Sequence, residues 1–377
     1  MDDAIAGSYV FTGERSAKSY QLNKMANTLR SDENRTRFQA DEAGYMRDMG
    51  CSEQEIDLVR RRDWKAMMEY GGSIYNAAEN RRGGGPLVAT NRRPHQREGP
   101  LTMARVIGGI GTSHAPTIGV AWDKGQQKEP LWAPLFDGYV PAREWLAGVR
   151  PDLFLIVYND HVNHFFFDAY PTFALGVGAV HEQADEGWGK RPLPDLPGDP
   201  DFAWHLARSL VADEFDPTIC QEMALDHGIL SFLPLLTDTD WKVPVVPLAV
   251  NVIQHPIPTA RRLFRLGAAL RRAIESYPRD KRIVVFGTGG LTHQLHGEGF
   301  GRHNEAWDNE FMDRLETDPA GLSELSIQEY MERGGTEGVE MIMWLAMRGA
   351  LGETVKRVHR NYTAPFTTGY GLLVLEN

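Results

Sequence analysis

The chain has 377 residues, which is long for one domain and comfortable for a large domain with a smaller one. Its 40 basic and 51 acidic residues give a net charge of −11, which argues against nucleic acid or an anionic membrane as the main partner. The two cysteines, Cys51 and Cys220, cannot form a disulfide framework, and no apolar run approaches the roughly 18–20 residues of a membrane span, so we expect a cytoplasmic protein.

Residues 1–80 have the pattern of a small all-helical domain. The run Ser52-Glu-Gln-Glu55 is a capping box, which marks the start of a helix. Asp63 can cap a second helix over residues 64–70, and Gly71 is suited to end it. We find no catalytic constellation here and interpret the Met, Leu and Tyr residues at helical spacing as packing residues.

Residues 81–102 differ abruptly in composition from what precedes them. The stretch contains Gly83-Gly-Gly-Pro86 and several arginines, a composition typical of a linker. Met103 then begins a segment that would make sense as the start of an independent chain. We therefore interpret residues 103–377 as a second domain that is fused to the first.

Strands and helices alternate in residues 103–377. Short apolar runs bounded by turn residues predict strands at 105–109, 153–158, 173–177, 243–250, 282–287 and 371–375. Longer periodic segments predict helices at 202–214, 259–277, 304–316 and 337–350, and His359 is also assigned to a helix. We expect an ordered surface loop at 184–200. This alternation is typical of an α/β domain, here with a central mixed sheet flanked by helices.

Three histidines follow predicted strands. His161 ends the run Leu153-Phe-Leu-Ile-Val-Tyr-Asn-Asp-His161, while His114 and His293 follow the strands at 105–109 and 282–287. In open α/β sheets, ligands collect at the carboxyl ends of the strands. One such histidine is weak evidence for a site, but three indicate a shared pocket in which imidazoles hold a metal or move a proton.

A carboxylate lies within an apolar segment of the last predicted helix, Gly338-Val-Glu-Met-Ile-Met-Trp344, at Glu340. A buried carboxylate is costly unless it is paired or bound to a metal. Glu337, one turn earlier, is the competing candidate and could instead favour the helix N-terminus. Two histidines and one carboxylate form the ligand set of non-haem Fe(II) enzymes that activate oxygen, although a zinc hydrolase with a His/His/Glu set stays open.

At these residues the chain resembles the class III (LigB-type) extradiol ring-cleaving dioxygenases, in particular the protocatechuate 4,5-dioxygenase and gallate dioxygenase group. The motifs that carry the resemblance span nearly all of residues 103–377 and include Thr112-Ser-His114, Val157-Tyr-Asn-Asp-His161, Ala184-Asp-Glu-Gly-Trp-Gly189, Leu225-Asp-His-Gly228, Gly287-Thr-Gly-Gly-Leu-Thr-His293 and Glu337-Gly-Val-Glu340. Residues 8–80 look like the small helical α subunit of the two-chain enzymes.

The resemblance implies that Fe(II) is bound by His114, His161 and Glu340. It implies that His293 is the acid/base that takes a proton from the catechol, so that O₂ can be added and the ring opened beside its two hydroxyls. The implied main substrate is protocatechuate, cleaved at the 4,5 bond to 4-carboxy-2-hydroxymuconate-6-semialdehyde. Gallate or 3-O-methylgallate is the alternative, and a zinc-dependent hydrolase or a non-catalytic binding protein on the same fold would be of another class.

The resemblance also assigns three further residues to the pocket. His227 is implied to be a catalytic histidine near substrate and oxygen, Asn159 to line the pocket in a supporting role, and Thr367 to lie near the substrate carboxylate. By analogy with the two-chain enzymes we expect a homodimer. A short Gly/Arg linker replaces the further helices of the free α subunit, so this chain departs from the family in the part that covers the active site.

Overall fold

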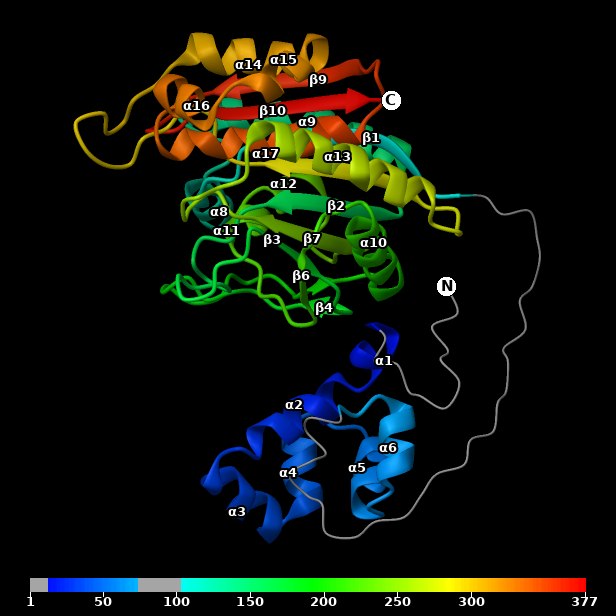
Figure 1. Ribbon diagram of the computed structural model, residues 1–377. Coiled ribbons are helices and arrows are strands. Elements are labelled where there is room, and N and C mark those ends of the chain that lie inside the picture. The colour runs from blue at the N-terminus through cyan, green and yellow to red at the C-terminus, as the bar shows by residue number, and fades with distance from the viewer. Residues whose placement is uncertain (1–12, 74–102) are drawn as a thin grey trace. The chain divides into compact units, whose positions relative to one another are not determined.

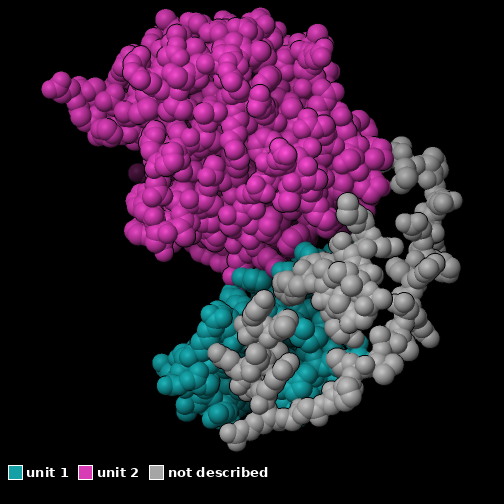
Figure 2. Space-filling model, in the orientation of Figure 1, with its two compact units in different colours: residues 1–98 teal, residues 99–377 magenta. Residues whose placement is uncertain are grey.

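The computed structural model describes residues 13–73 and 103–377. The chain divides into two compact units, residues 1–98 and residues 99–377 (Figure 2). The stretch predicted to be a linker, 81–102, lies outside the described residues. No helix in the described ranges is long and apolar enough to cross a membrane.

The first unit is helical over its described residues. Its helices are α1 (Gly13–Lys18), α2 (Tyr20–Thr28), α3 (Asp32–Ala40), α4 (Glu42–Asp48), α5 (Glu53–Arg60) and α6 (Trp64–Tyr70). The predicted capping box is confirmed, because the Ser52 and Glu55 side chains each accept a hydrogen bond from the other's backbone N–H. Asp63 caps α6 by accepting from the N–H of Ala66 at 3.0 Å, as predicted.

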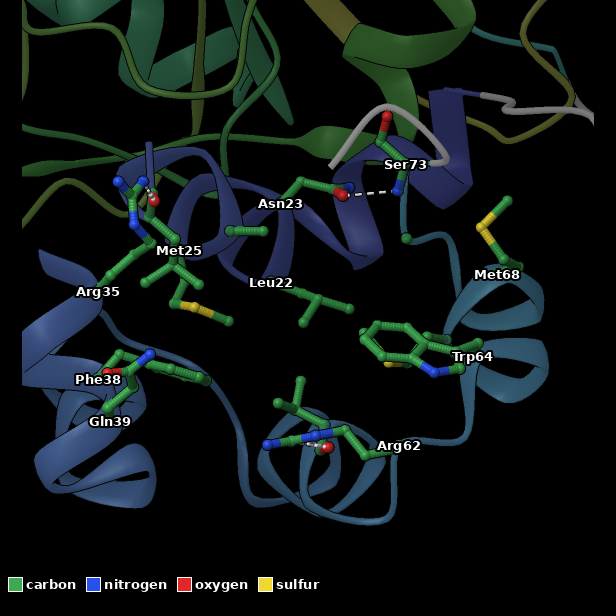
Figure 3. A pocket seen from close by; sticks show the side chains of 15 residues that line it. Leu22, Asn23, Met25, Arg35, Phe38, Gln39, Arg62, Trp64, Met68 and Ser73 are labelled. Carbon is green, nitrogen blue, oxygen red and sulfur yellow. Dashed lines mark hydrogen bonds between the residues drawn. The ribbon is translucent and has the colours of Figure 1, made fainter. Parts of the chain in front are cut away.

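Apolar side chains form the small core of this unit and line a cavity of about 240 Å³. Figure 3 shows Leu22 and Trp64 facing this space, with Met25 and Phe38 at its other side. Among the described residues, both groups of histidine and acidic side chains that are close enough to hold a metal ion lie in the second unit. The candidate metal-binding site is therefore in the second unit.

The second unit is built on one eight-stranded mixed sheet (Figure 1). Its strands are β1 (Arg105–Thr112), β2 (Leu153–Tyr158), β3 (Phe173–Gly176), β6 (Thr218–Cys220), β7 (Val245–Val250), β8 (Arg282–Thr288), β9 (Lys356–Thr363) and β10 (Tyr370–Glu376), and the pair β4 (Val180–His181) and β5 (Leu196–Pro197) lies apart. The strand order is β6-β3-β7-β2-β8-β1-β10-β9. Strands β7, β2, β8 and β1 are parallel neighbours, so their carboxyl ends share one edge.

Helices cover both faces of the sheet and bury it. They are α8 (Pro116–Asp123), α9 (Ala133–Val149), α10 (Pro200–Ala212), α11 (His227–Leu230), α12 (Leu233–Leu236), α13 (Ala260–Glu275), α14 (Glu305–Thr317), α15 (Pro319–Glu324), α16 (Ile327–Gly334), the 3₁₀ helix η2 (Glu337–Ile342) and α17 (Met343–Ala350). Successive residues of β2 point to opposite faces: Leu155 belongs to the core cluster that includes residues of α10, α13 and α17, while Ile156 belongs to the cluster with residues of α8, α9 and α12. The predicted α/β class with a helical N-terminal part is confirmed.

One assignment from the sequence is wrong, and one long helix was not predicted. His359 lies on β9 rather than on a helix, and its Nε2 is 2.7 Å from the carbonyl oxygen of Gly138. Strand β9 is an edge strand of the sheet, and its charged and half-exposed side chains lack the apolar run that marks a buried strand. The long helix α9 was not predicted, because Pro141 interrupts its pattern.

Candidate functional site

His114 is delivered by β1, two residues after the strand ends. Its Nδ1 lies 2.8 Å from the hydroxyl oxygen of Thr288, at the end of the neighbouring strand β8. Its Nε2 is buried, has no hydrogen-bond partner among the described residues, and lies 3.2 Å from Oε2 of Glu340. Burial is the largest influence on His114 and lowers its pKa below the ordinary value, which favours the neutral ring, the form in which histidine binds metals.

His161 is delivered by β2, three residues after the strand ends. Both its backbone N–H and its Nδ1 donate to Oδ2 of Asp226, at 2.7 and 3.0 Å, which leaves Nε2 to face Glu340 Oε1 at 3.8 Å. Burial lowers the pKa of His161, but Asp226 and Glu340 outweigh it and raise the pKa to about 10. A metal cation can take the place of the proton that these carboxylates hold on the ring.

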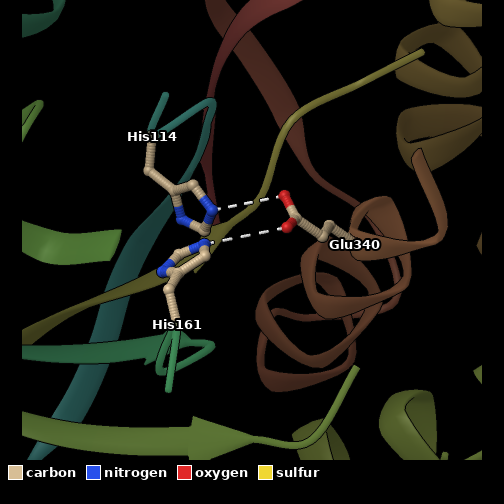
Figure 4. A group of neighbouring side chains, drawn as sticks. All are labelled: His114, His161 and Glu340. Carbon is tan, nitrogen blue, oxygen red and sulfur yellow. Dashed lines mark ion pairs between the residues drawn. The ribbon is translucent and has the colours of Figure 1, made fainter. Parts of the chain in front are cut away.

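Glu340 enters the same space from η2 (Figure 4). Its Oε2 accepts a hydrogen bond from the N–H of Gly290 at 2.8 Å. Gly289 has a φ of +130°, and a Cβ there would lie 2.8 Å from the Glu340 carbonyl oxygen, so this turn requires glycine. Burial raises the pKa of Glu340, but His114 and the neighbouring histidines hold it well below its ordinary value. Glu337 instead accepts from the N–H of Leu295 at 2.9 Å.

The side chains of His114, His161 and Glu340 fit a divalent metal ion. One ligand atom from each lies within 4.8 Å of the others, and a cation would satisfy the buried, unpartnered Nε2 of His114. Two imidazoles and one carboxylate leave coordination positions open, which suits a catalytic Fe(II) or Zn²⁺ centre. A second group, formed by His161 with Asp226 and His227, shares a histidine whose Nδ1 is already bonded to Asp226, so we interpret it as support for the first.

His293 lies beside this group, after β8 and its glycine turn. Its Nδ1 donates to the carbonyl oxygen of Leu291 at 2.8 Å, so Nε2 is left free to accept a proton. That Nε2 is 3.9 Å from Oε2 of Glu340. The backbone of His293 is fixed by a bond from its N–H to the Gly334 carbonyl and by a bridge to Thr368. This geometry would allow His293 to exchange a proton with a molecule next to the candidate metal position.

His227 lies at the start of α11 and closes the group on another side. Its ring packs on that of His161 with centroids 3.8 Å apart, and edge-on to His114 at 6.0 Å. Glu186, from the loop between β4 and β5, accepts hydrogen bonds from the His227 backbone N–H and from its Nδ1. His114, His161 and His293 therefore face Glu340, and the ring of His227 lies against those of His161 and His114.

Of the other two predicted site residues, Asn159 and Thr367, only Thr367 is among the described residues that line the cavity. Asn159 is fully buried, with its Nδ2 3.1 Å from Nε2 of His161 and 3.4 Å from Oε1 of Glu340. It is not among the described residues that line the cavity. Thr367 does line the cavity, next to Thr368. Asn159 thus contacts the possible metal ligands, whereas Thr367 belongs to the wall that a ligand would touch.

The cavity in front of these groups has a volume of about 610 Å³, which is in the range of small-molecule sites. Apolar side chains from three loops and one helix line it, namely Val252, Ile253, Leu295, Met331 and Phe366. The polar groups among its described lining residues are histidines, hydroxyls and Glu337 and Glu340, with neither lysine nor arginine. The cavity therefore suits a small aromatic molecule that carries hydroxyl groups.

Four supporting side chains were not predicted individually. Asp226 orients His161, Glu186 orients His227, Thr288 orients His114, and Asp308 accepts from the Thr292 N–H and hydroxyl at 2.8 and 2.6 Å, directly beside His293. Burial raises the pKa of Asp308. Three of them, Asp226, Glu186 and Thr288, stand within the sequence motifs quoted above, but their roles depend on contacts between distant segments.

Two family models match the chain. Residues 108–373 match the catalytic LigB subunit of aromatic ring-opening dioxygenase, and residues 22–79 match the LigA subunit of aromatic-ring-opening dioxygenase LigAB. The first match includes every residue of the site described above and more than half of the chain. The resemblance noted from the sequence motifs is thereby confirmed.

Individual relatives match over part of their length. A gallate dioxygenase from Pseudomonas putida is 48% identical over 196 residues, which are 52% of this chain and 58% of that protein. A 2,3-dihydroxyphenylpropionate/2,3-dihydroxicinnamic acid 1,2-dioxygenase from Rhodococcus jostii is 32% identical over 48% of this chain and 54% of that protein. The chain thus spans little more than half the length of these relatives. A crystal structure of an uncharacterized Escherichia coli K12 protein aligns with a TM-score of 0.44 at 17% identity, over 72% of this chain and 100% of that one.

The match over residues 108–373 and the motifs at His114, His161, His293 and Glu340 agree on one assignment. The same segment forms the mixed sheet that brings these side chains to one edge. This chain belongs to the LigB family, the catalytic subunits of aromatic ring-opening dioxygenases.

Proposed function

We propose that this protein is an Fe(II)-dependent extradiol dioxygenase that opens the aromatic ring of gallate with O₂. The observation that carries the proposal is the convergence of His114, His161 and Glu340 on one position, with His293 beside it and all four lining a cavity of about 610 Å³. Family membership favours iron over the zinc that the same donor set would accept.

Gallate replaces protocatechuate as the favoured substrate. The sequence motifs favour protocatechuate and keep gallate as the alternative, but the relative at 48% identity is a gallate dioxygenase. The hydroxyls of Thr117, Thr367 and Tyr370 and several histidines line the cavity. These groups can hydrogen-bond the carboxylate and the third ring hydroxyl of gallate without a lysine or arginine.

Different residues of the chain have different roles in the proposed reaction. When bound by His114, His161 and Glu340, Fe(II) supplies a Lewis acid for the ring oxygens and an electron source for O₂. His293 takes the proton of a ring hydroxyl on Nε2, because Leu291 holds the other nitrogen in its protonated form. It can return that proton to an oxygen atom as the ring opens. Asn159 supports His161 and Glu340, and His227 faces the substrate.

Oxygen uptake on three substrates tests both the reaction and the substrate. Protein purified without oxygen and loaded with Fe(II) should consume O₂ with gallate, protocatechuate and 3-O-methylgallate. We expect kcat/KM for gallate to exceed that for protocatechuate about 5- to 150-fold, because a cavity donor left unpaired costs roughly 1–3 kcal/mol. The measurement is O₂ consumption with an electrode, with product absorbance recorded in parallel.

The outcomes separate the competing functions. A preference for protocatechuate would return the substrate assignment to the one favoured by the motifs. Substrate turnover that persists without O₂ and Fe(II) would instead indicate the zinc-dependent hydrolase. Binding of gallate without any O₂ uptake would indicate a binding protein on the same fold, and the dioxygenase proposal would then be abandoned.

Asp226→Asn should weaken iron binding about 10- to 100-fold, the usual effect of removing a carboxylate that orients a metal-bound histidine. The asparagine amide would turn an N–H₂ group toward either the N–H of Gly228 or the donors of His161, which Asp226 now accepts from. Equilibrium dialysis against Fe(II) under nitrogen measures the affinity. Asp318→Asn is the matched control, because Asp318 also caps a helix by accepting from Gly321, away from the site. Equal affinities in the two variants would contradict the role given to Asp226.

The organisation of the chain is a second proposal. We propose that residues 1–80 form an α-subunit-like helical domain, that 81–102 link it to a catalytic domain at 103–377, and that the protein is a homodimer. The match of residues 22–79 to the LigA subunit supports the first part. The homodimer rests on analogy with two-chain enzymes.

A further inference from the structure

Glu186 accepts two hydrogen bonds from His227, one from its backbone and one from its ring. One carboxylate oxygen, Oε1, accepts from the backbone N–H of His227 at 3.0 Å, and the other, Oε2, accepts from its Nδ1 at 2.5 Å. The side chains are nearly buried, with 11% of Glu186 and 13% of His227 exposed. A charge-assisted pair with both carboxylate oxygens engaged fixes direction as well as distance.

The loop that carries Glu186 is built to keep this carboxylate in place. Asp185, its neighbour, accepts from the N–H groups of Gly187 and Gly189 at 2.9 Å, and both glycines have positive φ, at +93° and +88°. Arg191 ties the far side of the loop to Asp123 on α8 through two bonds of 2.7 Å. These contacts of Asp185 and Arg191 therefore hold the loop on both sides of Glu186.

The pairing decides which nitrogen of His227 faces the cavity. A carboxylate oxygen can only accept, so Nδ1 must carry the proton, and Nε2 is left for a molecule in the cavity. The ring is also held by packing on His161, with centroids 3.8 Å apart. A rotation of the His227 ring would break both the bond to Glu186 and this packing.

We infer that Glu186 is a positioning residue for ring cleavage, which acts by fixing the tautomer and the orientation of His227 so that Nε2 meets the oxygen atoms of the substrate. The inference rests on the proposed function, because it assumes that His227 faces a bound substrate. Glu186 itself does not line the cavity among the described residues. Its effect on turnover must therefore pass through His227.

Glu186→Gln is the decisive variant. A glutamine can accept only one of the two His227 donors, and its N–H₂ group can donate to Nδ1, which favours the opposite tautomer with the proton on Nε2. We expect kcat to fall about 10- to 100-fold, the range for residues that orient a functional histidine. Iron content and KM should stay within about twofold of the wild type. Glu182→Gln is the matched control, because Glu182 lies in the same loop but its side chain is 72% exposed and pairs only with Lys190 in the described structure.

A double-mutant cycle with His227→Gln tests whether Glu186 acts through His227. If it does, adding Glu186→Gln to His227→Gln should change kcat by less than about twofold, because coupled residues are not additive. Full additivity of the two effects, or wild-type kcat in Glu186→Gln, would overturn the inference. Loss of iron in Glu186→Gln would overturn it as well, because Glu186 would then support the metal position.

The tautomer can be read without turnover. In full-length protein labelled with ¹⁵N-histidine and loaded with diamagnetic Zn²⁺, His227 should show a protonated Nδ1 in the wild type and a protonated Nε2 in Glu186→Gln. If Glu186→Gln does not fold, Glu186→Asp, which keeps the charge but shortens the reach, should show a mixture of both forms. An unchanged tautomer would refute the inference. Absence of iron-dependent O₂ uptake by the wild type would refute the proposed function while this readout still decides the positioning role.

Discussion

Glu340→Gln should lose stable iron binding, with affinity reduced more than about a hundredfold. The carboxylate faces two imidazoles and accepts from the N–H of Gly290 in a buried space. Glutamine removes the negative charge and directs an N–H₂ group at the position of the cation or at Gly290. Breaking a buried pair of this kind costs roughly 3–5 kcal/mol. Iron per chain after dialysis without oxygen measures the effect.

Glu337→Gln is the matched control for this prediction. Glu337 is in the same 3₁₀ helix, one turn earlier, but its carboxylate accepts from the N–H of Leu295 and lies 3.1 Å from His296. We expect it to retain iron. If Glu337→Gln lost iron and Glu340→Gln kept it, the roles of the two glutamates would have to be exchanged.

His293→Gln should keep its iron but lose turnover by about 10²- to 10⁴-fold, which is the usual contribution of a positioned acid/base. Nε2 of His293 is the free ring nitrogen beside Glu340, and glutamine cannot take up a proton there. The kinetic measurement is kcat from O₂ uptake at saturating gallate, with iron content determined on the same sample.

His205→Gln provides the comparison for His293→Gln. His205 lies on α10, and its Nε2 is 2.9 Å from the carbonyl oxygen of Ala273, outside the cavity lining among the described residues. Its turnover should equal that of the wild type. Retention of kcat within about threefold in His293→Gln would remove His293 from the acid/base role, and loss of iron would make it a ligand instead.

The parts of the fold and site that the sequence predicts are those with a strong local pattern. Strand β2 is an unbroken apolar run because it is buried on both faces, and β8 has the same property. Each is followed by a histidine at the same edge of the sheet, which is why the sequence predicts a shared site there. Glu340 stands out in the same way, as an acidic residue in an otherwise apolar segment.

The parts that could not be predicted depend on contacts between distant segments or on weak patterns. Asp226 is 65 residues from His161, and Glu186 is 41 residues from His227, so neither pairing can be predicted from the spacing of neighbouring residues. The choice between Glu337 and Glu340 depends on which histidines stand opposite, which only the assembled sheet decides. Edge strand β9 has little apolar surface to bury and hence little signal.

The adjacency of β1, β8 and β2 in the sheet would have a consequence for how the protein acquires the proposed metal ion. The side chains of His114 and His161 come from near the start of the second unit and that of Glu340 from near its end, so an unfolded chain holds the proposed ligands far apart. If the protein binds iron as proposed, iron would therefore favour the native state over the unfolded one, and each tenfold rise in iron above its dissociation constant would add about 1.4 kcal/mol to the free energy of unfolding. Iron loading and the free energy of unfolding should therefore rise together, because both depend on the assembled sheet.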